Sequence, residues 1–152
     1  AALLIGSGPW PETWRVQRLA VERIGPVLNP RLEDATRITA LSPAALLNEP
    51  LLHTASRPQA WPAWAERAGA AGVVPQLATG FEHLYFLLEA ATAGLGVAIA
   101  PQELVADDIA AGRLLAPWGF VETDAHWVLA TRQDAADARI APLAAWLRAQ
   151  LA

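Results

Sequence analysis

The feature that most constrains the fold is a block between Gly80 and Trp118 in which a helix–strand pattern occurs twice. In each half, an apolar helical stretch ends at a glycine, Gly94 in the first and Gly112 in the second, and a short apolar run follows. Helices commonly end at a glycine, and short uninterrupted apolar runs are typical of buried strands. The alternation of helices with buried strands predicts an α/β fold.

The same signals predict the elements along the rest of the chain. Ser42 followed by Pro43 is typical of a helix start, because the serine side chain caps the first turn and proline suits the first helical position. The expected helices span 43–47, 59–68, 80–93, 102–111 and 139–151, and the expected strands span 2–5, 18–28, 51–53, 73–77, 95–101, 113–118 and 127–131.

Composition restricts the classes of function. The chain has 152 residues, of which 54% are apolar and 17% charged, as in a compact folded domain. It contains no cysteine, which excludes disulfides, thiolate metal sites and cysteine nucleophiles. All eleven basic residues are arginines scattered along a chain of net charge −4, which argues against nucleic-acid binding by this chain alone. Prolines, glycines and charges interrupt every apolar run, so no membrane segment is expected.

Catalytic motifs are missing or incomplete. The turn Gly6-Ser7-Gly8 lacks the Gly-x-Ser-x-Gly spacing of a nucleophile elbow. The chain has no His-x-x-x-His pair, phosphate loop, paired-carboxylate motif or complete dinucleotide fingerprint. The sequence therefore predicts a protein that is not an enzyme and needs no metal or cofactor.

Three segments, in order, resemble the C-terminal effector-binding domain of LysR-type transcriptional regulators. They are 5–11, 50–57 together with Trp61 and Trp64, and 80–118. The second segment is similar to the branch that contains glycine-cleavage and β-lactamase regulators. The resemblance implies a two-lobed α/β domain of the type II periplasmic-binding-protein kind, with an incomplete first lobe. It places residues 1–25 and 121–152 in subdomain I and 26–120 in subdomain II.

The resemblance also implies function. A small-molecule effector is expected in a cleft between the lobes, and its binding would shift the population of subunit arrangements. DNA would be contacted only through an N-terminal winged helix-turn-helix that this sequence does not contain. The regulator would be cytoplasmic. The alternative is a fragment of a periplasmic solute-binding protein, which shares the two-lobed architecture.

The effector-site candidates come from both lobes. Thr79 is expected to cap the helix that begins at Gly80, leaving the amides of Gly80 and Phe81 for a ligand carboxylate, although Glu82 would repel an anion and an ordinary helix start is the alternative. Several other residues have the simpler alternative of a tight turn, a packed side chain or an ordinary hydrogen bond. These further candidates are Ser7, Gly8, Trp10, His53, Thr54, Ile99 and Pro101.

Apolar residues run around the whole of the predicted helix 80–93. One stripe contains Phe81, Leu84, Tyr85, Leu88 and Ala91, and a helix of this kind needs two packing partners. The first partner is its own sheet, and the resemblance implies that the second is another subunit in a homodimer or larger homo-oligomer. Burial by other residues of the same protein is the alternative. The predicted dimer stripe contains His83, Phe86, Leu87 and Ala90.

Overall fold

The computed structural model describes residues 1–152 and divides them into two compact units. Unit 1 consists of Ala1–Glu22 and Thr123–Ala152, and unit 2 consists of Arg23–Glu122. The chain passes from unit 1 into unit 2 within one strand and returns within another. The observed boundaries lie close to the predicted ones at 25/26 and 120/121. The assignment of the units to the two subdomains stays a prediction.

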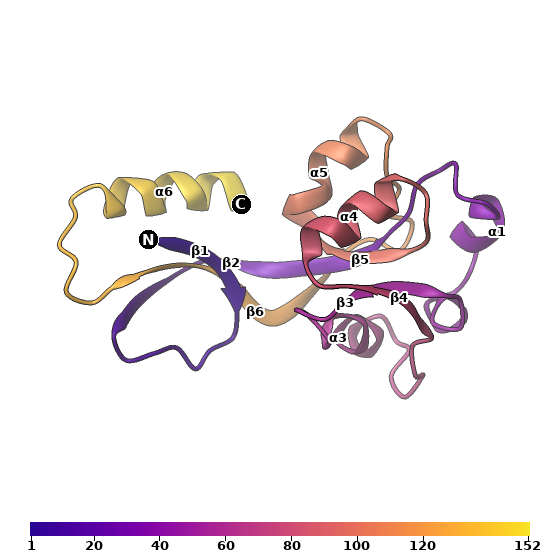
Figure 1. Cartoon of the computed structure of the whole chain (residues 1–152), viewed down its shortest axis with the longest axis horizontal. Helices are drawn as coiled ribbons and strands as arrows, with labels where there is room; N and C mark the ends of the chain where they lie inside the picture. The colour runs from indigo at the N-terminus through magenta and orange to yellow at the C-terminus, as the bar shows by residue number, and fades with distance from the viewer. The chain divides into compact units, whose positions relative to one another are not determined.

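Unit 1 is built on an antiparallel sheet. Strand β1 (Ala2–Gly6) pairs with strand β6 (Val121–Arg132), and the register places Ala2 opposite Ala130 and Gly6 opposite His126. Strand β2 (Trp14–Val27) is the next neighbour of β6. Helix α6 (Ile140–Leu151) runs alongside this sheet, and the Arg148 guanidinium donates to the carbonyl of Arg18 at 3.3 Å (Figure 1).

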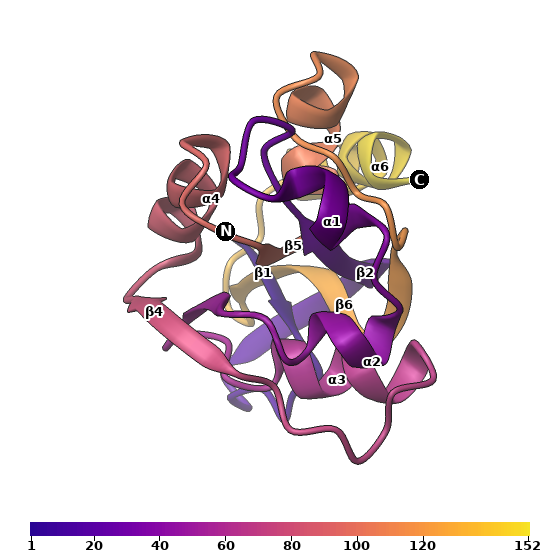
Figure 2. The ribbon, with the colours of Figure 1, turned by 90° about the vertical axis from the view of Figure 1, so that its right-hand side faces the viewer.

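Unit 2 contains the other strands and five helices. Strands β3 and β4 form a parallel pair, and strand β5 pairs antiparallel with the end of β2. Figure 2 shows that the chain runs from β4 into α4 and then into β5. The elements are β3 (Leu51–Thr54), β4 (Leu77–Phe81), β5 (Ala98–Pro101), α1 (Ala35–Thr39), α2 (Pro43–Leu46), α3 (Ala60–Arg67), α4 (Leu84–Thr92) and α5 (Gln102–Ala110).

The core of unit 2 lies around helix α3. Trp61 and Trp64 are 2% and 0% exposed and meet edge to face, with ring centroids 5.9 Å apart. The Trp61 indole also donates to the carbonyl of Leu52 at 3.0 Å, which ties α3 to β3. The sequence-based interpretation of these tryptophans as core residues is confirmed.

Local signals located most helix ends correctly. The Ser42 hydroxyl accepts a hydrogen bond from the Ala45 amide at 3.2 Å, as expected for the cap of α2. Gly69, Gly94 and Gly112 follow their helices with φ values of 78°, 80° and 74°, a conformation that costs glycine little. No helix of the structure has the length and apolar character needed to cross a membrane.

The segment before α4 contradicts the sequence-based prediction. Residues 77–81 form strand β4, and the helix begins only at Leu84, so the predicted helix start at Gly80 and the predicted strand at 73–77 are both wrong. The reason is tertiary, because β3 supplies hydrogen-bond partners to these residues. The predicted strand at 113–118 is reduced to one antiparallel bridge between Leu115 and Leu28.

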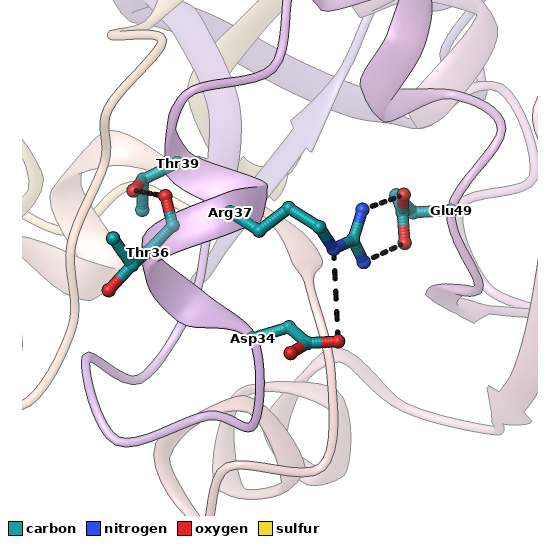
Figure 3. A network of polar contacts seen from close by, with 5 residues as sticks. All are labelled: Asp34, Thr36, Arg37, Thr39 and Glu49. Atoms are coloured by element: carbon teal, nitrogen blue, oxygen red, sulfur yellow. Dashed lines mark hydrogen bonds and ion pairs between the residues drawn. The ribbon is translucent and has the colours of Figure 1, made fainter.

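Helix α1 has no sequence signal strong enough to predict it. Asp34 precedes it with a φ of 62° and its side chain does not cap the helix. An ion pair holds the helix instead: the Arg37 guanidinium reaches both carboxylate oxygens of Glu49, at 2.7 and 3.0 Å, and lies 3.7 Å from Asp34 (Figure 3). The hydrogen bonds from Arg37 lower the pKa of the Glu49 carboxyl.

Candidate functional site

The candidate site in unit 2 lies where β3 and β4 end. His53 pairs with Gly80 and Thr54 with Phe81, and the Ala55 amide donates to the carbonyl of Phe81 at 2.9 Å. In open α/β sheets, ligands bind outside the carboxyl ends of parallel strands. The structure therefore brings together four of the predicted effector residues, His53, Thr54, Gly80 and Phe81, at the edge where a ligand is expected.

His53 lies directly against the backbone of β4. A Cβ atom added at Gly80 would lie 2.7 Å from the His53 ring carbon Cε1, so any larger residue there would displace the imidazole. The His53 Nε2 atom lies 3.3 Å from the carbonyl oxygen of Ala78. A carbonyl can only accept, so Nε2 carries the proton and Nδ1 remains as a second hydrogen-bonding atom. The absence of a side chain at Gly80 thus leaves room for a polar ring at the site.

Two hydroxyl groups close the end of β3. Thr54 is 2% exposed, and its Oγ1 atom lies 2.9 Å from the Oγ atom of the exposed Ser56. The Ser56 amide also donates to Thr54 Oγ1 at 3.4 Å, so the threonine hydroxyl organises the turn. Ser56 is not among the effector candidates predicted from the sequence, although a serine two residues after a strand-ending threonine is a recognisable hydroxyl-turn signal.

The predicted capping role of Thr79 is wrong. Thr79 is an exposed residue within β4, and the residue that precedes α4 is His83, whose side chain makes no capping hydrogen bond. The amides of Gly80 and Phe81 therefore belong to a strand and not to a helix N-terminus. The physical basis for a carboxylate site at these two amides is lost.

Two predicted lining residues, Ile99 and Pro101, are buried residues of β5. Ile99 is 3% exposed and belongs to the hydrophobic cluster around α3. Pro101 is also buried and precedes helix α5. All four residues of β5 are buried, and an effector contact of either side chain stays a prediction.

The predicted residues of unit 1 lie in the loop after β1. The Trp10 ring covers Gly6, where an added Cβ would lie 2.7 Å from Trp10 Cη2, and it stacks on Trp14 with centroids 6.4 Å apart. Gly8 has a φ of 78°, and Ser7 is exposed. Trp10 thus packs on its own loop, and the effector contacts of Ser7, Gly8 and Trp10 stay predictions.

Helix α4 presents a different face to solvent from the predicted one. Leu87 and Ala90 are 0% and 5% exposed and belong to the core of unit 2, so placing them in a dimer interface was wrong. Tyr85 and Phe86 are 67% and 52% exposed, with ring centroids 5.6 Å apart. The exposed His83 ring lies 6.2 Å from that of Phe86. We call His83, Tyr85 and Phe86 the α4 aromatic patch.

The site contains no arrangement suited to a metal ion, because no group of three or more histidine, aspartate or glutamate side chains is placed to bind one. Its chemistry is hydrogen bonding from an imidazole and hydroxyls beside exposed strand backbone. Such groups suit recognition of a small polar molecule.

Comparison with known proteins identifies the family. The model of the LysR substrate binding domain matches residues 1–152. The chain is 58% identical, over 152 residues, to the HTH-type transcriptional regulator TrpI of Pseudomonas aeruginosa. The match covers 100% of this chain and 52% of TrpI. It is 31% identical to the glycine cleavage system transcriptional activator of Escherichia coli, covering 99% of this chain and 49% of that protein. The chain thus spans about half the length of the curated relatives it matches.

Solved structures agree with these relatives. The effector domain of the transcriptional regulator AmpR of Pseudomonas aeruginosa has a TM-score of 0.79 at 27% identity, covering 98% of this chain and 70% of that chain. The AmpR effector binding domain from Citrobacter freundii, at 24% identity and a TM-score of 0.75, shares the fold over 98% of this chain and 72% of its own.

The predicted fold class, the two-lobed type II periplasmic-binding-protein kind, is confirmed by these effector domains. The alternative of a periplasmic solute-binding protein is not supported, since the curated relatives are transcriptional regulators. The predicted resemblance to glycine-cleavage regulators is confirmed. The chain belongs to the LysR substrate-binding domain family.

Proposed function

We propose that this chain is the effector-sensing and dimerisation domain of a cytoplasmic, LysR-type bacterial transcriptional regulator and that it catalyses no reaction. The observation that supports effector binding most directly is the packing of His53 on Gly80 at the ends of β3 and β4. The glycine costs strand stability and has no side chain to pack, so its value lies in admitting the imidazole.

In this proposal the effector is a small polar molecule recognised by His53 Nδ1 and by the hydroxyls of Ser56 and Thr79. Thr54 acts indirectly, because its buried hydroxyl holds Ser56 in place. Effector binding would stabilise the folded domain, since a ligand that binds only the native state raises its unfolding free energy. DNA would be bound by a winged helix-turn-helix elsewhere in the regulator.

The site is tested by thermal unfolding in the presence of the common amino acids and simple carboxylic acids. One or more should raise Tm in the parent chain. Gly80→Ala should remove that shift because its methyl group displaces His53, whereas Gly112→Ala, where an added Cβ meets nothing within 4 Å, should keep it. An equal shift in the parent and in Gly80→Ala would contradict the site.

We also propose that a second copy of the chain packs on the α4 aromatic patch. A cluster of exposed aromatic rings is typical of subunit interfaces, where such rings supply contact area. Phe86→Asp should convert dimers into monomers in sedimentation velocity. Leu104→Asp is the matched control, because Leu104 is also exposed, at 44%, but lies on helix α5. Dimers that persist in Phe86→Asp would rule the patch out.

A further inference from the structure

The chain crosses between the units twice, at Glu22/Arg23 and at Glu122/Thr123, and these four residues are joined in pairs. The Thr123 hydroxyl donates to the Glu22 carboxylate at 2.8 Å, and both residues belong to unit 1. The Arg23 guanidinium lies 3.1 Å from the Glu122 carboxylate, and both belong to unit 2. Each crossing strand is therefore tied to the other immediately before and immediately after the boundary.

The two ties differ in environment. Glu22 is 1% exposed, whereas the side chains of Arg23 and Glu122 are 45% and 62% exposed. Consecutive residues of a strand point to opposite faces, so the ties lie on opposite faces of the two crossing strands. A pair of strands held on both faces resists sliding in either direction. The buried tie is the stronger, because a hydrogen bond to a buried charged group contributes more to stability than an exposed ion pair does.

The neighbouring contacts keep the same two segments together. Within unit 2, the Leu28 amide donates to the Leu115 carbonyl at 3.1 Å and the reverse bond is 2.8 Å. Gly25 lies so close to the Gly119 carbonyl oxygen that a Cβ atom would collide with it. Within unit 1, the Thr123 hydroxyl also accepts from the Ala125 amide at 3.1 Å. Within unit 2 the two segments thus stay side by side beyond the boundary, with an antiparallel bridge between Leu28 and Leu115.

We infer that the Glu22–Thr123 and Arg23–Glu122 pairs form a clasp that makes the two crossing strands act as one hinge ribbon. Relative motion of the units would then have to bend the ribbon as a whole, because the clasp opposes sliding of one strand past the other. Without the clasp, only the backbone pairing of β2 with β6 would oppose sliding, and a wider range of arrangements would be allowed. The clasp is a conformational device set by four side chains, and it rests on the fold and not on the proposed effector.

The absence of native cysteine makes a direct test possible. Spin labels would be attached in the full chain at Ala145→Cys on α6 and Ala110→Cys on α5, both of which are exposed positions. Pulsed electron–electron double resonance would then give the distribution of distances between the two spin labels. We expect Thr123→Val to broaden that distribution and Thr123→Ser, which keeps the hydroxyl, to leave it as in the parent.

The matched control is Thr131→Val. Thr131 lies on the same strand, is 7% exposed and donates to the Arg15 carbonyl at 3.4 Å, but lies away from the boundary. A parent-like distribution in Thr123→Val, or equal broadening in Thr131→Val, would overturn the clasp. Should Thr123→Val fail to fold, Arg23→Ala decides: it breaks the exposed tie, and a smaller broadening supports the clasp while an unchanged distribution overturns it.

Amide hydrogen exchange provides a second readout. Loss of a hydrogen bond to a buried charged group should raise exchange of the amides at residues 22–25 by roughly tenfold or more. Amides in the core around Trp64 should exchange as in the parent chain. Equal acceleration in both places would mean general destabilisation and would count against a local clasp.

Discussion

Units 1 and 2 are stabilised in different ways. Unit 2 contains two hydrophobic clusters, one around α3 with Trp61 and Trp64 and one beneath α4 with Leu87. The buried apolar residues of unit 1 are fewer: four consecutive residues of β6 and Ala144 of α6. Its large side chains Leu143 and Trp146 remain 37% and 59% exposed. Burial of apolar surface is the main favourable term in folding, so unit 2 carries most of the packing stability.

The difference bears on how the molecule works. A unit with a dense core moves as a rigid body, since close-packed interiors deform little. Unit 1 depends more on the ladder of β1, β6 and β2 and on polar ties such as Glu22–Thr123. Changes in unit 2 should therefore alter global stability, whereas changes in unit 1 should alter local opening.

The largest expected effect separates the two cores. Trp61→Ala should lower the free energy of unfolding by about 3–5 kcal/mol, because it removes a buried ring and a hydrogen bond. Trp146→Ala, on the exposed face of α6, should change it by less than about 0.5 kcal/mol. Urea denaturation of both variants measures the difference. Equal losses would mean that unit 1 has a core as important as that of unit 2.

A close backbone approach gives the next largest effect. Gly25→Ala should destabilise the chain by about 1–3 kcal/mol, because the methyl group would meet the Gly119 carbonyl and force the strands apart. Gly72→Ala is the control: its φ of 85° disfavours alanine but nothing lies within 4 Å. We expect a loss of about 1 kcal/mol there. A control loss equal to that of Gly25→Ala would show that crowding is unimportant.

The two core tryptophans differ in one hydrogen bond. The Trp61 indole donates to Leu52, whereas Trp64 Nε1 is buried without a hydrogen-bond partner. Trp61→Phe should therefore cost about 1–2 kcal/mol more than Trp64→Phe, by the same denaturation measurement. The opposite order would mean that the Trp64 indole has a polar partner such as a buried water molecule.

Acid should weaken exposed ion pairs in both units. The resulting change in the free energy of unfolding should be the smallest of the predicted effects. Arg139 lowers the pKa of Asp137 in unit 1 from 3.8 to about 2 through hydrogen bonds. A carboxyl whose pKa is lowered by folding stabilises the folded state above its unfolded pKa. That contribution is lost as the pH falls through the folded pKa, here from about 3.8 towards about 2.

Glu49 in unit 2 follows the same sign, since Arg37 lowers its pKa. NMR titration of the two carboxyls should show both midpoints below those of the unpaired residues. Arg139→Ala should raise only the midpoint of Asp137, and only partly, because the backbone amide of residue 139 still donates to it. Urea titrations at falling pH should show little change in stability from Asp137→Asn, because the Asp137–Arg139 pair is solvent-exposed. A midpoint of Asp137 that does not move in Arg139→Ala would mean that the backbone amide of residue 139, and not the guanidinium, lowers the pKa.

Features that depend on near neighbours could be predicted from the amino-acid sequence. The cap at Ser42, the glycine stops at Gly94 and Gly112, and the core role of Trp61 and Trp64 follow from residue type and spacing, because caps, turns and helix faces are set within a few residues. The three ordered segments were also sufficient to indicate the family. His53, Thr54 and Gly80 were named as effector candidates from the sequence, the structure brings them to two paired strands, and their contact with an effector stays a prediction.

Features that depend on distant partners could not be predicted and became visible only in the folded chain. Residues 77–81 became a strand because β3 is available to pair with them, and Thr79 lost its capping role for that reason. Helix α4 is apolar on all sides, so periodicity could not show that Leu87 is buried and Phe86 exposed. The clasp joins residues about a hundred positions apart. Such distant residues form hydrogen bonds and bury one another only when the chain is folded, so local sequence preferences do not predict these contacts.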